Sequence, residues 1–195
     1  VTASIVDAAS DNNFDSVNDQ TVSVSTTDND VAGFTITQSG GSTSVAETGT
    51  TDTFTVVLNA QPDSDVVLSI TSSDTGEATV TSALTFTSGN WNSAQTVTVT
   101  GVDDNLIDGT ITSTITVAVN DGSSDNNFDS VNDQTVSVTT TDDDVAGFTI
   151  TQTGGSTSVS ESGTTDTFTI VLNAQPAENV VFSITSSDTG EATVT

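Results

Sequence analysis

The chain repeats itself at an offset of 114 residues, and this repeat limits the possible folds more than any other feature of the sequence. Residues 11–24 and 125–138 both read DNNFDSVNDQTVSV. Residues 31–81 match residues 145–195 at 43 of 51 positions. In a tandem array each repeat buries equivalent apolar residues in the same way, and neighbouring repeats contact one another. We therefore expect one small domain type, used several times along the chain.

The repeat boundaries follow from the same alignment. We expect residues 1–30 to be the C-terminal strands of a preceding repeat, because they match 115–144 at 21 of 30 positions. Residues 31–144 then form one complete repeat, and residues 145–195 form the N-terminal half of the following one. Both ends fall inside repeats, so we expect the native chain to continue in both directions. A repeat of 114 residues is long enough for a core of its own.

The charge of the chain excludes several classes of function. There are 27 acidic residues and no Lys, Arg or His, which gives a net charge of −27. Nucleic acids and anionic membranes are therefore excluded as electrostatic partners. Without His, Lys or Cys the usual nucleophile–base pairs cannot be built, so we expect no enzymatic activity and no small-molecule substrate. Zinc sites made of Cys or His are impossible, whereas oxygen ligands suit hard cations such as Ca²⁺.

The hydrophobic pattern predicts β-strands throughout. Val, Ile, Phe and Thr alternate with polar residues at period 2, and Ser, Gly, Asn and Asp clusters separate the runs. This pattern is typical of an all-β fold made of tandem Ig-like antiparallel β-sandwiches. We expect strands over 33–38, 43–46, 52–59, 66–71, 78–87, 95–101, 110–119 and 134–141.

Alternation also predicts which side chains form the core. Trp91 is the sole Trp, and we interpret it as a cover for the end of the core, with stacking on a sugar ring as the alternative. The predicted core residues are Phe34, Ile36, Val45, Phe54, Val56, Leu58, Val67, Ile70, Leu84, Phe86, Val97, Val99, Ile111, Ile115, Val117, Val136 and Val138.

The acids of the complete repeat gather in loops that share one pole of an Ig-like sandwich. Nine carboxylates close together repel by several kcal/mol, and a divalent cation converts this repulsion into attraction. Ca²⁺ takes about 6–8 oxygen ligands from carboxylates, carbonyls and water. The backbone carbonyls of 105–107 are also well placed to contribute. The acids are Glu47, Asp74, Glu77, Asp103, Asp104, Asp108, Asp142, Asp143 and Asp144.

These motifs resemble the Calx-β domain, which occurs in sodium–calcium exchangers and, as long arrays, in bacterial surface proteins. The resemblance rests on the V-x-E of Val45 and Glu47, on Pro62 after an apolar strand, on ALTFTSGNW, on the VDDN-x-x-DG turn and on the terminal DDD. It implies Ca²⁺ ligands in the complete repeat and in both partial repeats. Because Asn105, Leu106 and Ile107 precede Asp108, we expect one or two ions per junction. The implied ligands are Glu47, Asp74, Asp103, Asp104, Asp108, Asp142, Asp143, Asp144, Asp28, Asp30, Glu161 and Asp188.

A second acidic segment allows two interpretations. Residues 125–129 have the D-x-N-x-D pattern of an EF-hand loop but lack its Gly and its final Glu. We favour an ordered turn plugged by Phe128, and a second cation site is the alternative.

The function that fits these features is an extracellular rod, secreted or displayed on a cell surface. Ca²⁺ would lock adjacent repeats of the same chain, forming an adhesin stalk or a matrix fibre. Copies of the chain could also associate laterally or end to end. Two alternatives remain open: an adhesion module that binds a glycan or protein, and a calcium sensor. A lectin should show a concave aromatic pocket.

Overall fold

The computed structural model describes the whole chain, residues 1–195. The chain divides into two compact units, Val1–Val31 and Ala32–Thr195. Its helices are single 3₁₀ turns of three residues, and none is long and apolar enough to cross a membrane. All other regular structure is β-strand, so the predicted all-β class is confirmed.

The first unit is a small hairpin. Strand β1 (Thr2–Ala3) pairs antiparallel with β2 (Gln20–Thr21), and the turns η1 (Asp7–Ala9) and η2 (Asn12–Phe14) lie between them. Every residue of this unit is exposed, so it has no core of its own.

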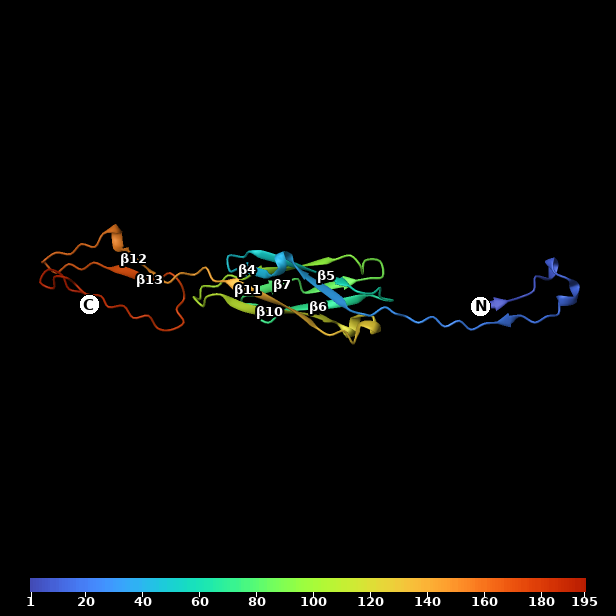
Figure 1. The fold of residues 1–195 in the computed structure, drawn as a ribbon. Coiled ribbons are helices and arrows are strands. Elements are labelled where there is room, and N and C mark those ends of the chain that lie inside the picture. The colour runs from blue at the N-terminus through green and yellow to red at the C-terminus, as the bar shows by residue number, and fades with distance from the viewer. The chain divides into compact units, whose positions relative to one another are not determined.

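The second unit contains a sandwich of two sheets. The sheet orders are β4-β11-β10-β6-β8 and β3-β5-β9-β7, and only the β4–β11 pair is parallel. In Figure 1, β10 and β6 run along one side of this body and β5 along the other. The strands are β3 (Phe34–Gln38), β4 (Thr43–Ala46), β5 (Thr51–Leu58), β6 (Val66–Ser72), β7 (Ala78–Val80), β8 (Ala83–Phe86), β9 (Gln95–Gly101), β10 (Ile111–Val119) and β11 (Gln134–Thr141).

One predicted strand, 78–87, is wrong, because the structure divides it between the two sheets. The Thr81 N–H donates to the Thr98 carbonyl on β9, whereas the Ser82 carbonyl accepts from Ile70 N–H on β6. The chain therefore crosses from one sheet to the other at Thr81–Ser82. β7 lies at the edge of one sheet and β8 at the edge of the other.

The core lies between the sheets and is built from alternating Val, Ile, Leu and Phe. On β6 the buried residues are Val66, Leu68 and Ile70, so the predicted core position Val67 is wrong. With a period of 2, Ile70 and Val67 cannot face the same side of a strand. Ile36 is only partly buried. Trp91 packs against the core, which confirms its interpretation as a core cover.

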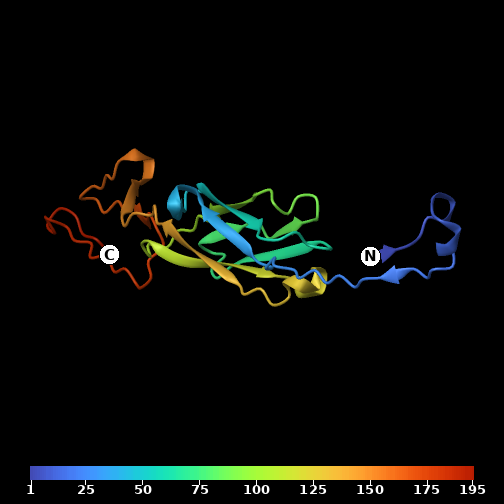
Figure 2. The same ribbon diagram turned by 45° about the vertical axis from the view of Figure 1, so that its right-hand side comes forward.

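The segment between β10 and β11 is an ordered turn at one end of the sandwich. It contains η4 (Asp121–Ser123) and η5 (Asn126–Phe128), and Phe128 is buried. The Asp125 carboxylate accepts hydrogen bonds from the N–H groups of Asp63, Ser64 and Asn127, at 2.6, 3.0 and 2.9 Å. This carboxylate is used to hold two loops together, as the interpretation of an ordered turn requires. Figures 1 and 2 place this segment at the end of the sandwich opposite the start of β10.

The remainder of the second unit contains a further hairpin. Strand β12 (Phe148–Gln152) continues through η6 (Thr153–Gly155) and pairs antiparallel with β13 (Phe168–Leu172). Phe148 pairs with Leu172 as Phe34 pairs with Leu58 in the sandwich. The repeat boundaries stay a prediction, although the register agrees with a 114-residue repeat.

Candidate metal centre

Glu47 is brought to the end of the sandwich by the parallel pair of β4 and β11. Its N–H donates to the Thr141 carbonyl, which extends this ladder by one residue. Gly101 at the end of β9 makes room for the crossing chain, because a Cβ there would overlap the carbonyl of Ala46. The side chain of Glu47 is therefore buried at the end of the sandwich, with 1% of its surface exposed.

Glu77 approaches the same point from the β6–β7 turn. Its carbonyl accepts from Val102 N–H at 2.9 Å and from the Thr140 hydroxyl at 3.4 Å. These bonds fix the residue between β9 and β11. Ala78, the next residue, is fully buried, and Glu77 itself is 6% exposed. A second carboxylate is thus enclosed beside Glu47.

The β9–β10 loop, residues 102–110, brings two more acids. Asp104 accepts from the N–H of Leu106 at 2.6 Å, which turns the chain back. Gly109 has a φ of +77°, a conformation that favours glycine, and its N–H donates to Asp142 at 2.8 Å. These two turns place Asp104 and Asp108 on the pole that holds Glu47.

The structure gathers five carboxylates there in two overlapping groups. Glu47, Glu77 and Asp108 form one group, and Glu47, Asp104 and Asp144 form the other. Within each group one oxygen per residue lies within 4.8 Å of the others. Ca²⁺ bonds oxygen at about 2.3–2.6 Å, so two ligands of one ion lie at most about 5 Å apart. We call these five residues the carboxylate pole.

The carboxylate pole is electrostatically strained without a cation. Burial, with the charges of Asp142 and Asp104, raises the pKa of Glu47 to about 7. Burial and the Asp108 carboxylate likewise raise the pKa of Glu77. Burial and the Asp142 carboxylate raise the pKa of Asp144. One oxygen of each of Glu47, Glu77 and Asp144 is buried and accepts no hydrogen bond. A cation would satisfy these oxygens, and no Lys, Arg or His exists to do so.

Other predicted ligands lie nearby but do not join either group. Asp142 accepts from the N–H groups of Gly109 and Asp144, and these bonds lower its pKa. Asp74 accepts from Gly76 N–H in a local turn. Asp103 and Asp143 act at longer range, since their charges help to raise the pKa of Asp144.

The predicted ligands in the partial repeats are not gathered into a group of three acids. Asp28, Asp30, Glu161 and Asp188 are all exposed. Asp28 accepts from Asp30 N–H, and Asp188 accepts from Gly190 N–H, which repeats the bonds of Asp142 and Asp74. Each local turn therefore forms from its own sequence, whereas the group of carboxylates needs the complete sandwich.

The sequence did not single out Glu77 as a candidate ligand, although this residue was counted among the acids of the pole. In SSDTGE the Asp and the Glu are both acidic candidates, and the resemblance implied Asp74. Tertiary contacts distinguish them: the Glu77 carbonyl is held by Val102 N–H and the Thr140 hydroxyl, whereas the Asp74 carboxylate accepts from Gly76 N–H in a local turn.

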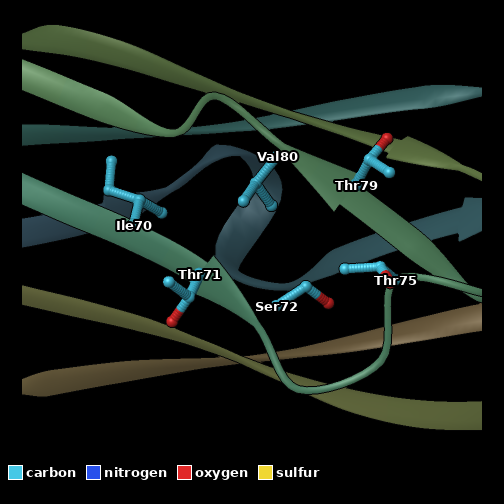
Figure 3. A pocket seen from close by; sticks show the side chains of 6 residues that line it. All are labelled: Ile70, Thr71, Ser72, Thr75, Thr79 and Val80. Atoms are coloured by element: carbon cyan, nitrogen blue, oxygen red, sulfur yellow. The ribbon is translucent and has the colours of Figure 1, made fainter.

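Two cavities lie elsewhere. One of about 310 Å³ lies between β6, the following turn and β7, and Figure 3 shows its six lining side chains. None is aromatic: they are Ile70, Thr71, Ser72, Thr75, Thr79 and Val80. The second, about 340 Å³, involves Ile107 and the β12–β13 hairpin. Its residues Phe148, Leu172 and Pro176 correspond to Phe34, Leu58 and Pro62, which are buried in the complete repeat. The second cavity is thus lined in part by counterparts of residues that are buried between 31 and 144.

The fold is similar to those of several solved structures. Domains 4 and 5 of the S-layer protein SbsC are 27% identical, with a TM-score of 0.40, over 65% of this chain and 54% of that one. The apo-form Calx CBD1 domain is 16% identical, with a TM-score of 0.40, over 57% of this chain and 98% of that one. CBD12 from CALX1.2 is 18% identical, with a TM-score of 0.40, over 60% of this chain and 47% of that one.

No protein-family model matches the chain, and no curated protein matches it. All three TM-scores lie below 0.5, so these neighbours add no information on function. The β-sandwich is defined by the sheet order and register described above.

Proposed function

We propose that the chain is part of an extracellular structural array, in which Ca²⁺ binds at the carboxylate pole and stiffens the junction between repeats. The observation that carries this proposal is the pair of buried, unpartnered oxygens on Glu47 and Glu77, two residues that converge with acids from two other segments, the β9–β10 loop and the chain after β11. A buried carboxylate without a hydrogen-bond donor is costly, and Ca²⁺ is the oxygen-seeking cation that suits such a site.

The choice of Ca²⁺ over Mg²⁺ rests on the crowding of protein carboxylates. Mg²⁺ requires nearly octahedral geometry at about 2.0–2.1 Å and keeps several waters, whereas Ca²⁺ accepts irregular cages of protein oxygen. Glu47 is shared by both groups, so the pole has ligands for one or two ions. A Calx-β type of domain, expected from the sequence motifs, is consistent with this assignment.

A structural role is favoured over a lectin-type adhesion module. The β6–β7 cavity has no aromatic side chain on which a sugar ring could stack. Nearly identical repeats supply length, which a spacer needs. A secreted or cell-surface location fits a site that can work at about 10⁻⁴–10⁻³ M Ca²⁺. We propose no enzymatic activity.

The test is a Ca²⁺ titration followed by calorimetry and by thermal unfolding. The fluorescence of Trp91 reports the complete repeat, because this side chain packs on its core. At a hundredfold excess over Kd, one site should stabilise the native state by about 2.7 kcal/mol. Glu47→Gln and Glu77→Gln should each remove most of this Ca²⁺ response. EDTA should reverse the stabilisation of the wild type.

The matched control is Glu161→Gln, which removes the same charge at the corresponding position of the following repeat. Glu161 is exposed and belongs to no group of acids, so its substitution should leave Ca²⁺ binding unchanged. Glu47→Gln should also raise the stability of the Ca²⁺-free protein, because it removes a buried charge. A misfolded variant would instead be less stable, so this measurement separates loss of Ca²⁺ binding from misfolding. A wild type that neither binds nor is stabilised by millimolar Ca²⁺ would falsify the proposal.

A further inference from the structure

We propose that the β9–β10 loop couples the carboxylate pole to the next repeat: its tip, residues 105–107, docks on the turn after β13, at residues 174–176. The proposal rests on the proposed function and identifies the partner surface of the same site. That partner is the next repeat of this chain.

The contact lies within the second unit and consists of main-chain pairing at the loop tip. The Gln175 N–H donates to the Asn105 carbonyl at 2.6 Å, and Leu106 and Gln175 form an isolated parallel bridge. Asn105 O therefore accepts from the next repeat, although the sequence suggested it as a metal ligand. Main-chain bonds of this kind depend on loop geometry and not on side-chain identity.

An apolar side chain adds to the contact. Ile107 lies against the cavity that is bounded by Ala146, Gly147 and Pro176. In residues 31–144 the corresponding Ala32 and Gly33 are partly exposed and Gln61 is exposed, whereas Ala60 and Pro62 are buried, so part of this rim stays open when the core behind it is closed. Ile107 keeps 38% of its surface exposed in this contact, so docking removes only part of its apolar surface from water.

The same loop carries ligands of the carboxylate pole on both sides of the docking tip. Asp104 precedes residues 105–107 and belongs to one group, and Asp108 follows them and belongs to the other. Asp104 also accepts from Leu106 N–H, which ties the tip to the ligand directly. A cation that fixes Asp104 and Asp108 would hold residues 105–107 in one conformation and reduce the entropy lost on docking.

Coupling of this kind is reciprocal. If Ca²⁺ favours docking, docking must increase the affinity for Ca²⁺ by the same factor. A substitution in the next repeat, at a residue that is not itself a carboxylate of the pole, should therefore weaken Ca²⁺ binding there.

The experiment compares Ca²⁺ affinity by calorimetry in the full chain. Gln175→Pro removes the N–H donor, and Ile107→Ser removes the apolar contact as an independent variant. Each should raise the Kd for Ca²⁺ about fivefold or more, the lower end of typical coupling. Gln61→Pro is the matched control, because it lies in the same Asn-Ala-Gln-Pro sequence of the complete repeat and should leave the Kd unchanged.

Amide hydrogen exchange provides the second measurement. Adding Ca²⁺ should slow exchange at Gln175 in the wild type and have no such effect at Gln61. Wild-type affinity in both Gln175→Pro and Ile107→Ser would overturn the coupling and leave the proposed function intact. A wild type that binds no Ca²⁺ would overturn both.

Discussion

At the scale of single residues, Glu47 has the largest influence on the site, because it belongs to both groups of converging carboxylates. Its position at the end of β4 encloses it, while Glu77 and the acids of the β9–β10 loop surround it. Its side chain should therefore be protonated when no cation is present and ionised when a cation is bound.

This behaviour predicts how stability depends on pH when Ca²⁺ is absent. The pKa of Glu47 rises from 4.5 to about 7 on folding, so the folded state retains a proton that the unfolded state has released. Its contribution is fully present below about pH 4.5 and is lost as the pH rises through 7. Denaturant unfolding in EDTA should give a free energy of unfolding that decreases from pH 4.5 to 8.

The variant Glu47→Gln should reduce this slope, since Gln does not titrate. Hydrogen bonds lower the pKa values of Asp125 and Asp142, so these groups affect stability only in more acidic solution, below their ordinary pKa of 3.8. A Ca²⁺-free wild type whose stability increases across this pH window would contradict the assignment.

Asp125 gives a separate prediction about the loops at the opposite end. Its carboxylate accepts from three backbone N–H groups, of Asp63, Ser64 and Asn127. Asp125→Asn replaces one accepting oxygen with a donor, and should cost about 1–3 kcal/mol because buried donors lose their partner. Asp11→Asn, in the same sequence of the first unit, should cost little, since Asp11 is exposed and its carboxylate accepts hydrogen bonds only from Asn13. Equal effects in urea unfolding would count against this role.

The sequence located the pole but did not identify every carboxylate that converges there. Glu47, Asp104 and Asp108 could be predicted, because each lies in a loop that an Ig-like sandwich delivers to one end. The choice between Asp74 and Glu77 could not, because it depends on a local competition. The Asp74 carboxylate accepts from Gly76 N–H, whereas Val102 N–H and the Thr140 hydroxyl hold the Glu77 carbonyl beside the pole.

At the scale of elements, the close approach of β4 to the end of β9 shapes the pole. A Cβ at Gly101 would overlap the Ala46 backbone, so only glycine fits there. Gly101→Ala should destabilise the complete repeat by about 1–3 kcal/mol, as overpacking does, and should weaken Ca²⁺ binding by displacing Glu47.

Gly89→Ala is the control for this prediction. A Cβ at Gly89 would lie 3.8 Å from the Thr87 hydroxyl, which is an ordinary contact. Its effect on the free energy of unfolding should stay below about 1 kcal/mol. Urea unfolding monitored by Trp91 measures both variants, and a Gly101→Ala protein as stable as the wild type would refute the packing argument.

Strand positions were predictable where alternation was strong. The ranges 43–46, 95–101 and 134–141 coincide with β4, β9 and β11. The split of 78–87 was not predictable, because the crossing at Thr81–Ser82 is decided by tertiary hydrogen bonds to β9 and β6. The prediction that Val67 lies in the core was wrong for a related reason. Val66, Val67 and Leu68 are consecutive apolar residues, so alternation alone does not show which of them face the core.

At the scale of the whole molecule, corresponding segments form the same local structure in different surroundings. Thr2 pairs with Thr21 in the first unit as Thr116 pairs with Thr135 in the sandwich. The hairpin register is thus specified within each segment. The buried residues and the converging acids, in contrast, all lie between Phe34 and Asp144.

Edge strands matter for association, because the chain has no Lys, and Pro62 is buried and not placed on an edge. The structure shows another form of protection. Gln134 donates its side-chain amide to the Phe34 carbonyl on β3, and Gln95 donates to the Thr85 carbonyl on β8. On β4 the Ser44 N–H donates to Asp52. These side chains occupy edge groups that could otherwise pair with another chain.

Association, if it occurs, should therefore use the neutral Thr and Ser faces or the poles, and it should depend on charge. The net charge of −27 keeps copies of the chain apart. Bound Ca²⁺ cancels part of this charge, while Na⁺ only screens it. We predict that light scattering will show lateral or end-to-end association in millimolar Ca²⁺ and much less in NaCl of equal ionic strength. Glu47→Gln should shift the onset of association to a higher Ca²⁺ concentration, because this variant should bind less Ca²⁺ at the carboxylate pole. A chain that stays monomeric in every condition would leave a solitary stalk as the structural role and exclude the fibre.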